Sequence, residues 1–146
     1  DRKNLERHAV TSVLRVASLA LLGLMGFWPL VAESLPACWT VEATEIIKVI
    51  DGDTFVARLR VWHQTEAVEA IRVLDIDTPE VRGGTETTRE RAARATAFTT
   101  EWLGRLPPPI VWSCRRDHFG RVLGKVYRSG SVLADELIAN GLGVAP

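Results

Sequence analysis

Acidic side chains that could bind a cation concentrate in two short segments of this 146-residue chain. The first, Asp51 to Thr54, places two carboxylates around a glycine, an arrangement that can direct oxygen ligands at a hard cation. Asp-Gly pairs are also common turns between strands, so this segment alone is compatible with an ordinary turn.

The second acidic segment combines three carboxylates with an arginine. Asp75, Asp77 and Glu80 lie within six residues, at the end of an apolar run that also contains Arg72. Neighbouring acids repel one another unless a cation or an arginine compensates their charge. The segment therefore indicates a charged site, and an acidic, solvated loop is the alternative.

A third segment, Asp117 to Arg121, places an arginine where a strand is expected to begin. Gly120 permits a tight backbone turn before Arg121. The planar guanidinium of arginine matches the oxygens of a phosphate and stays charged at any working pH. The alternative is an ordinary surface arginine.

Alternating and β-branched residues predict the strands that would carry these segments. The strands cover residues 40–50, 54–61, 67–76, 110–114 and 122–127. Helical spacing predicts helices over 87–106 and 132–140, the second with Ser131 as its N-cap and Gly141 as its stop. This order indicates an α+β domain, and five short strands suggest an OB-type β-barrel with two or three helices.

Two apolar patterns identify side chains that we expect in the core. In the second strand they alternate and comprise Phe55, Ala57, Leu59 and Val61. In the longer helix they recur at helical spacing and comprise Ala95, Phe98, Trp102 and Leu106.

The first 32 residues have the order of an export signal, with basic residues before a charge-free apolar run over 16–32. We expect a hydrophobic helix there, either a signal cleaved after Ala32 or Ala37 or an uncleaved membrane anchor. A buried core helix is the third possibility. The predicted organisation is a signal or anchor with a short linker over 1–37, followed by a domain over 38–146 that is secreted, periplasmic or membrane-anchored outside the cytoplasm.

The chain has two cysteines, Cys38 and Cys114. In an exported protein, two cysteines suggest one disulfide. Two unpaired thiols, or lipid attachment at Cys38, are the alternatives that the sequence leaves open.

Net charge argues against nucleic-acid binding by charge alone. The chain holds 18 basic and 18 acidic side chains, of which four and two fall in residues 1–32, leaving fourteen and sixteen in the rest. A protein that held DNA by charge would need a basic surface. If this chain handles nucleic acid, a bound cation and a few placed arginines must act locally.

Together the segments resemble the staphylococcal-type nuclease (thermonuclease) family, over roughly Val41 to Ala145. The resemblance is carried in order by residues 71–80, 97–99, 119–123 and 133–142. It implies an OB barrel and Ca²⁺ as the usual cofactor. It also implies that the first strand begins beside the strand of Cys114, so that Cys38 and Cys114 would pair.

Carried over by position, the resemblance also implies a ligand set for the cation. Asp53 and Asp77 look like the metal carboxylates, and the backbone carbonyl of Thr78 looks like a further ligand. Asp51 is similar to a residue of the outer shell. Where the family's best-known member has a tyrosine this chain has Phe119, which keeps a stacking face and loses a hydrogen bond.

The resemblance assigns the reaction to three side chains. Glu80 matches the general base for the attacking water, and Arg72 and Arg121 match the arginines that hold the scissile phosphate. The expected protein is a monomeric, calcium-dependent nuclease that cuts DNA and RNA with low sequence specificity and leaves 3′-phosphates. The alternative is a non-catalytic OB-fold module that binds nucleic acid.

Overall fold

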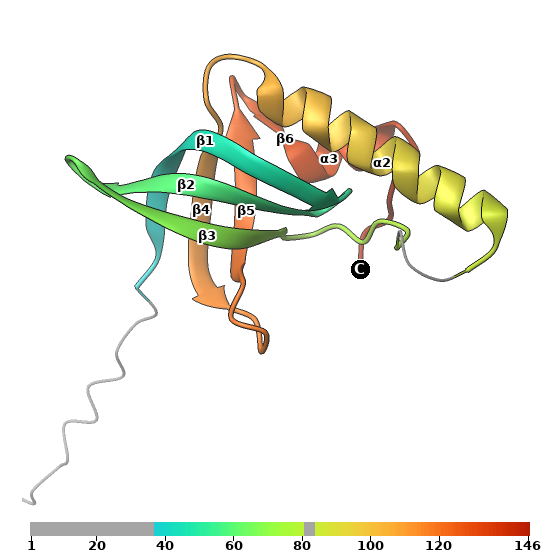
Figure 1. Ribbon diagram of the computed structural model, residues 1–146, viewed down its shortest axis with the longest axis horizontal. Helices are drawn as coiled ribbons and strands as arrows, with labels where there is room; N and C mark the ends of the chain where they lie inside the picture. Colours follow the sequence, from blue (N-terminus) through green and yellow to red (C-terminus); the bar gives the residue numbers. More distant parts are fainter. Residues whose placement is uncertain (1–36, 81–83) are drawn as a thin grey trace, which may run out of the picture. The chain divides into compact units, whose positions relative to one another are not determined.

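The computed structural model describes residues 37–80 and 84–146, and Figure 1 shows their arrangement. The elements in chain order are β1 (Trp39–Asp51), β2 (Thr54–Trp62), β3 (Thr65–Val73), α2 (Glu86–Gly104), β4 (Ile110–Arg116), β5 (Val122–Arg128), β6 (Ser131–Val132) and α3 (Leu133–Ala139). The predicted hydrophobic helix and the cleavage site at Ala32 lie outside the described residues. Of the helices within the described ranges, none is long and apolar enough to cross a membrane.

The strands form one sheet in the order β3-β2-β1-β4-β5-β6. All neighbouring pairs are antiparallel, and a parallel pairing of β3 with β5 closes the sheet into a five-stranded barrel. Closure removes the exposed edges of the five long strands. The prediction of an α+β, OB-type barrel is confirmed, and the described residues contribute two helices to it.

The barrel interior is filled by the inward faces of its strands. Phe55, Ala57 and Leu59 are fully buried, as their alternation predicts. Val61 is 44% exposed, so its predicted place in the core is wrong. It lies toward the tip of the β2–β3 hairpin, which projects beyond the barrel in Figure 1, and the next residue, Trp62, is also exposed.

Helix α2 covers one side of the barrel (Figure 1). It begins after Thr85, whose hydroxyl accepts a hydrogen bond from the backbone N–H of Thr88 at 3.3 Å. Ala95 and Trp102 are buried as predicted, but Leu106 is 85% exposed. That prediction is wrong because the helix ends at Gly104, and the helical spacing no longer applies beyond it.

Two predicted element boundaries are also wrong. Ser131 does not cap α3: it pairs with Arg128 in the short strand β6, and the N-cap is Val132, which makes no side-chain hydrogen bond. The third strand ends at Val73 rather than Ile76, because Asp75 adopts a left-handed backbone conformation (φ 64°) that interrupts it. Gly141 stops α3 as predicted, with a positive φ of 66°.

A disulfide joins Cys38 to Cys114, which confirms the predicted pairing. The antiparallel register of β1 and β4 pairs Trp39 with Ser113 and so brings the two cysteines together. The bridge spans a sequence separation of 76 residues. In the loop-entropy account, a crosslink of this span stabilises the fold by about 4 kcal/mol.

Candidate active site

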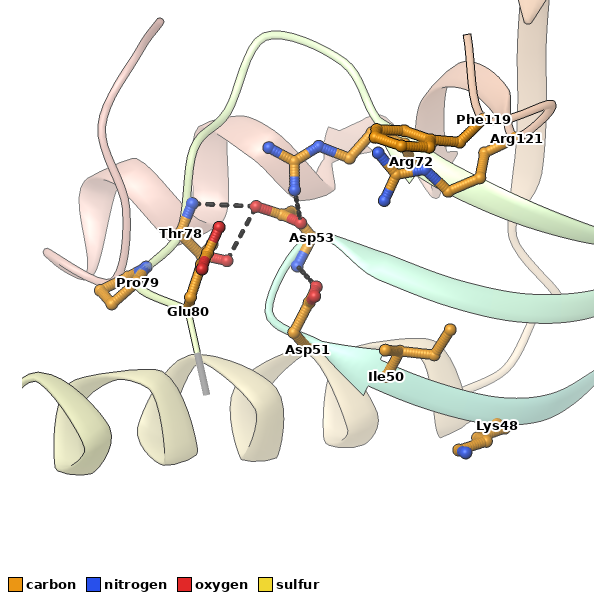
Figure 2. A pocket seen from close by; sticks show the side chains of 10 residues that line it. All are labelled: Lys48, Ile50, Asp51, Asp53, Arg72, Thr78, Pro79, Glu80, Phe119 and Arg121. Carbon is orange, nitrogen blue, oxygen red and sulfur yellow. Dashed lines mark hydrogen bonds and ion pairs between the residues drawn. The ribbon is translucent and has the colours of Figure 1, made fainter. Parts of the chain in front are cut away.

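A cleft of about 680 Å³ opens where the β1–β2 turn, the segment after β3 and the start of β5 meet (Figure 2). Its lining residues are Lys48, Ile50, Asp51, Asp53, Arg72, Thr78, Pro79, Glu80, Phe119 and Arg121. The three charged segments of the sequence therefore converge on one cavity. Asp77 is the one predicted site residue that does not line it, and it is attached to the cleft through Arg72.

Asp53 ties the first segment to the second. Its carboxylate is 1% exposed, and its Oδ2 accepts hydrogen bonds from the backbone N–H of Thr78 at 2.9 Å and from the Thr78 hydroxyl at 2.8 Å. Its Oδ1 accepts from the Thr54 hydroxyl at 3.0 Å and from the guanidinium of Arg72. A buried charge needs such partners, and here they fix the carboxylate at the base of the cleft.

The turn that carries Asp53 is held by helix α2. The carbonyl of Gly52 accepts a hydrogen bond from the buried Thr99 hydroxyl at 2.6 Å. A Cβ atom on Gly52 would lie 2.7 Å from the Cβ of Ala95 and 2.9 Å from that of Thr78. Only glycine fits between the helix and the segment after β3, so the motif's glycine sets the close approach of three elements.

Arg72 comes from the end of β3 and bridges two carboxylates. Its guanidinium donates to Asp53 and to Asp77, and its side chain is 24% exposed. Asp77 is itself fixed through its backbone, which exchanges two hydrogen bonds with Val144 near the C-terminus, at 2.8 and 2.9 Å. The predicted ligands Asp53 and Asp77 thus face one positive charge from two sides.

Asp51 lies behind Asp53 at the mouth of the turn. One of its carboxylate oxygens accepts a hydrogen bond from the backbone N–H of Asp53 at 3.2 Å. Burial raises the pKa of Asp51, and the nearby carboxylate of Asp53 raises it further. Asp51 therefore supports the turn from beside Asp53.

Glu80 and Arg121 reach the cleft from opposite walls. Glu80 is exposed and follows Pro79 in the extended segment after β3. Arg121 precedes β5, whose parallel register pairs Ile71 with Val122 and so brings both arginines to the same end of the barrel. In Figure 2 the side chains of Arg72 and Arg121 both extend into the cleft region.

The structure excludes one acid of the second segment and adds residues that sequence reasoning did not single out. Asp75 turns away from the cleft and forms an ion pair with Lys125 at 2.9 Å. Lys48 and Ile50 line the cleft from the end of β1. They are two residues apart on a strand that leads into Asp51, so alternation could have placed both on one face. Phe119 is 72% exposed on the opposite wall, as a stacking surface requires.

The fit of a metal ion can be judged from the donors. In the described part of the chain, no three His, Cys, Asp or Glu side chains form a ready metal cluster. Asp53 and Asp77 nevertheless converge on the Arg72 guanidinium, which stands where a positive charge is required. Carboxylate and carbonyl oxygens are the ligands of hard cations, and Ca²⁺ accepts waters for the remainder. The carboxylates of Asp53 and Asp77 fit such a cation once the Arg72 guanidinium moves away from them.

One cleft of the closed OB-type barrel thus gathers the carboxylates of Asp51, Asp53 and Glu80 with two arginines. A family model described as staphylococcal nuclease homologue matches residues 70–145, just over half of the chain. The chain belongs to this family, whose activity is that of nuclease hydrolases acting on nucleic acid. Arg72, Asp77, Glu80 and Arg121 lie within the matched range, and Asp51 and Asp53 precede it.

Proposed function

We propose that this protein is a calcium-dependent nuclease that hydrolyses the phosphodiester bonds of DNA and RNA with low sequence specificity and leaves 3′-phosphates. The observation that carries the proposal is the convergence of Asp53, Arg72, Glu80 and Arg121 on one open cleft. A site that reads phosphate reads no sequence, which accounts for the low specificity.

The arginines are assigned to the scissile phosphate. Phosphodiester cleavage depends on positioning and on stabilising the charge that develops on the phosphoryl oxygens. Arg72 and Arg121 come from β3 and from the start of β5, which are held together by main-chain pairing. Two guanidinium groups in this fixed relation can grip the oxygens from two sides, each with a planar pair of donors.

Glu80 is assigned as the general base. It is exposed in the cleft, so water can reach its carboxylate, whereas Asp53 is buried and fully engaged with Thr54, Arg72 and Thr78. A general base must come within hydrogen-bond reach of the attacking water, directly or through a second water, and the exposed carboxylate of Glu80 in this cleft meets this requirement.

Calcium binding is assigned to Asp53, Asp77 and the backbone carbonyl of Thr78, with Asp51 behind them. When bound, the ion supplies Lewis-acid polarisation of a phosphoryl oxygen and lowers the pKa of bound water. Few protein ligands imply a modest affinity, which suits a compartment where calcium is plentiful. For the ligands to face the ion, the guanidinium of Arg72 must leave both carboxylates, and it is then free for the phosphate.

The protein is proposed to act outside the cytoplasm as a monomer. Residues 1–37 would be a signal peptide or a membrane anchor with a short linker, and residues 38–146 the nuclease domain. The Cys38–Cys114 disulfide supports the location outside the cytoplasm, because structural disulfides form and persist in oxidising compartments. Membrane contact through residues 16–32 follows only if the segment stays uncleaved.

The test is digestion of supercoiled plasmid and of a labelled single-stranded RNA by the full chain, with millimolar Ca²⁺ or with chelator. Glu80→Gln is compared with Glu101→Gln, an exposed glutamate on α2 that pairs with Arg105 outside the cleft. We expect calcium-dependent cutting by the wild type and by Glu101→Gln, and a loss of several orders of magnitude in Glu80→Gln. The ends of the fragments are read by their need for phosphatase treatment before extension.

Two results would contradict the proposal. A folded wild-type protein that binds a labelled single strand without cutting it would support the non-catalytic OB module instead. Full activity in Glu80→Gln would remove Glu80 from the mechanism, and cutting that persists in chelator would remove calcium.

A further inference from the structure

Arg121 lies at the rim of the cleft, where its side chain needs support to act as a phosphate ligand. It is 31% exposed and precedes the first residue of β5. A free arginine side chain samples many rotamers, and ordering it costs conformational entropy. A rim arginine held in advance would bind a phosphate without that cost at the moment of reaction.

Asp117 supplies the support. Its Oδ2 accepts a hydrogen bond from Nε of Arg121 at 2.7 Å, and its Oδ1 accepts from the backbone N–H groups of Phe119 and Arg121, both at 2.9 Å. Its side chain is only 11% exposed. Among the described residues, Asp117 is the one side chain that bonds the Arg121 guanidinium, and it uses Nε, so both terminal nitrogens face the cleft unengaged.

The turn that carries Asp117 is fixed to the barrel by a second pair. Arg116 donates to the carbonyl of Gly120 at 2.8 Å and holds Glu69 with two hydrogen bonds of 2.6 and 2.7 Å. Glu69 lies on β3, three residues before Arg72. The strand that carries one phosphate arginine therefore also anchors the turn that aims the other.

The charge of Asp117 agrees with this role. Burial opposes its ionisation, but the hydrogen bonds and positive charge of Arg121 outweigh burial and hold the pKa of Asp117 below its ordinary value. The lowered pKa favours the ionised carboxylate, which is the form that accepts the hydrogen bond from Nε of Arg121.

We infer that Asp117 is a positioning residue, which orders the Arg121 side chain for the phosphate of the substrate. The inference rests on the proposed nuclease function and extends it to a side chain that does not line the cleft. Asp117 acts through Arg121 alone, so its contribution to catalysis must vanish when Arg121 is absent.

The first experiment is a double-mutant cycle on the full chain, with Asp117→Asn, Arg121→Ala and the pair together. We expect Asp117→Asn to lower kcat/KM by roughly 10- to 100-fold, as misplacement of a catalytic group does. The fall should lie in kcat, with KM little changed, because the arginine acts on the transition state. In the Arg121→Ala background the same substitution should cost nothing further.

Two controls separate positioning from folding. Asp75→Asn removes an acid that also pairs with a basic residue of the β5 region but faces away from the cleft, and its kcat should match the wild type. Asp117→Glu restores the charge on a longer side chain and should recover part of the lost rate. Thermal melting of every variant shows that the fold is retained at the assay temperature.

A second measurement needs no activity. By NMR, the Nε proton of Arg121 should exchange slowly with solvent in the wild type and quickly in Asp117→Asn, with Asp75→Asn unchanged. If the wild type proves inactive, the proposed function fails, and this measurement alone decides whether Asp117 orders Arg121. Equal exchange in wild type and Asp117→Asn, or a cost of Asp117→Asn that persists in the Arg121→Ala background, would overturn the inference.

Discussion

Replacing Gly52 by alanine tests whether helix α2 holds the turn of the cleft. The added Cβ would meet the Cβ of Ala95 at 2.7 Å and two side-chain atoms of Thr78 at 2.9 Å. These distances are shorter than side-chain atoms tolerate, and neither contact is the end of a long flexible side chain. The helix or the segment after β3 must therefore move.

The structure sets the size of the effect. Forcing a methyl group into a packed interior costs about 1–3 kcal/mol. For a domain of roughly 100 residues, each kcal/mol lowers Tm by about 4–8 °C. We expect Gly52→Ala to lower Tm by roughly 4–24 °C. Because Thr78 donates two hydrogen bonds to Asp53, its displacement should also weaken calcium binding.

The assay is thermal unfolding by circular dichroism, with calcium titration calorimetry on the same samples. Gly104→Ala is the matched control, since no atom lies within 4 Å of its added Cβ and the residue ends α2. It should leave Tm unchanged or raise it, by at most about 1 kcal/mol of added stability. A Gly52→Ala variant with the wild-type Tm and calcium affinity would refute the role given to this close approach.

Three further predictions concern the bridge, a surface ion pair and the cation. Replacing both Cys38 and Cys114 by alanine should lower the free energy of unfolding by about 4 kcal/mol in urea titration, and an unchanged value would contradict the loop-entropy argument. The hydrogen bonds from Arg116 hold the pKa of Glu69 below its ordinary 4.5, so the pair stabilises the fold above that pH and the stability is lost as pH falls through the lowered value. The stability difference between wild type and Glu69→Gln should therefore shrink from pH 7 to pH 3 in urea unfolding, and a constant difference would exclude the pair as its source. Asp53→Asn should raise the calcium concentration needed for half-maximal binding at least tenfold by calorimetry, and an unaltered titration would show that the ligand lies elsewhere.

Local sequence patterns predict the buried residues within the barrel strands correctly, but they fail at the ends of the strands and helices. Alternation from Phe55 to Leu59 predicts buried residues correctly, because each faces the interior of a closed sheet. The same alternation fails at Val61 and helical spacing fails at Leu106, since both lie beyond the point where a partner element covers them. Ser131 has the chemistry of an N-cap, but pairing with Arg128 in the sheet overrides that local preference.

For the candidate site, the sequence predicts which residues take part but not how their side chains pair. The side chains that converge were identified by their types and by the family resemblance, and the cleft contains them. The link of Arg72 to Asp53 and Asp77 could not be foreseen, because it depends on the side-chain direction at the end of β3. Asp75, two residues before Asp77, lies outside the site because its left-handed backbone conformation directs its side chain toward Lys125. This conformation could not be foreseen from the sequence either.

The two main-chain hydrogen bonds between Asp77 and Val144 connect the acidic segment after β3 to a segment that is distant in the sequence. Gly143 supports the contact, since a Cβ there would come within 2.8 Å of the Asp77 carbonyl oxygen. Thr78 follows Asp77 directly and donates two hydrogen bonds to the buried carboxylate of Asp53. A change near Val144 that breaks the main-chain pairing would therefore loosen Asp77 and Thr78 together. The geometry at the base of the cleft thus depends on a segment that contributes no side chain to the cleft lining.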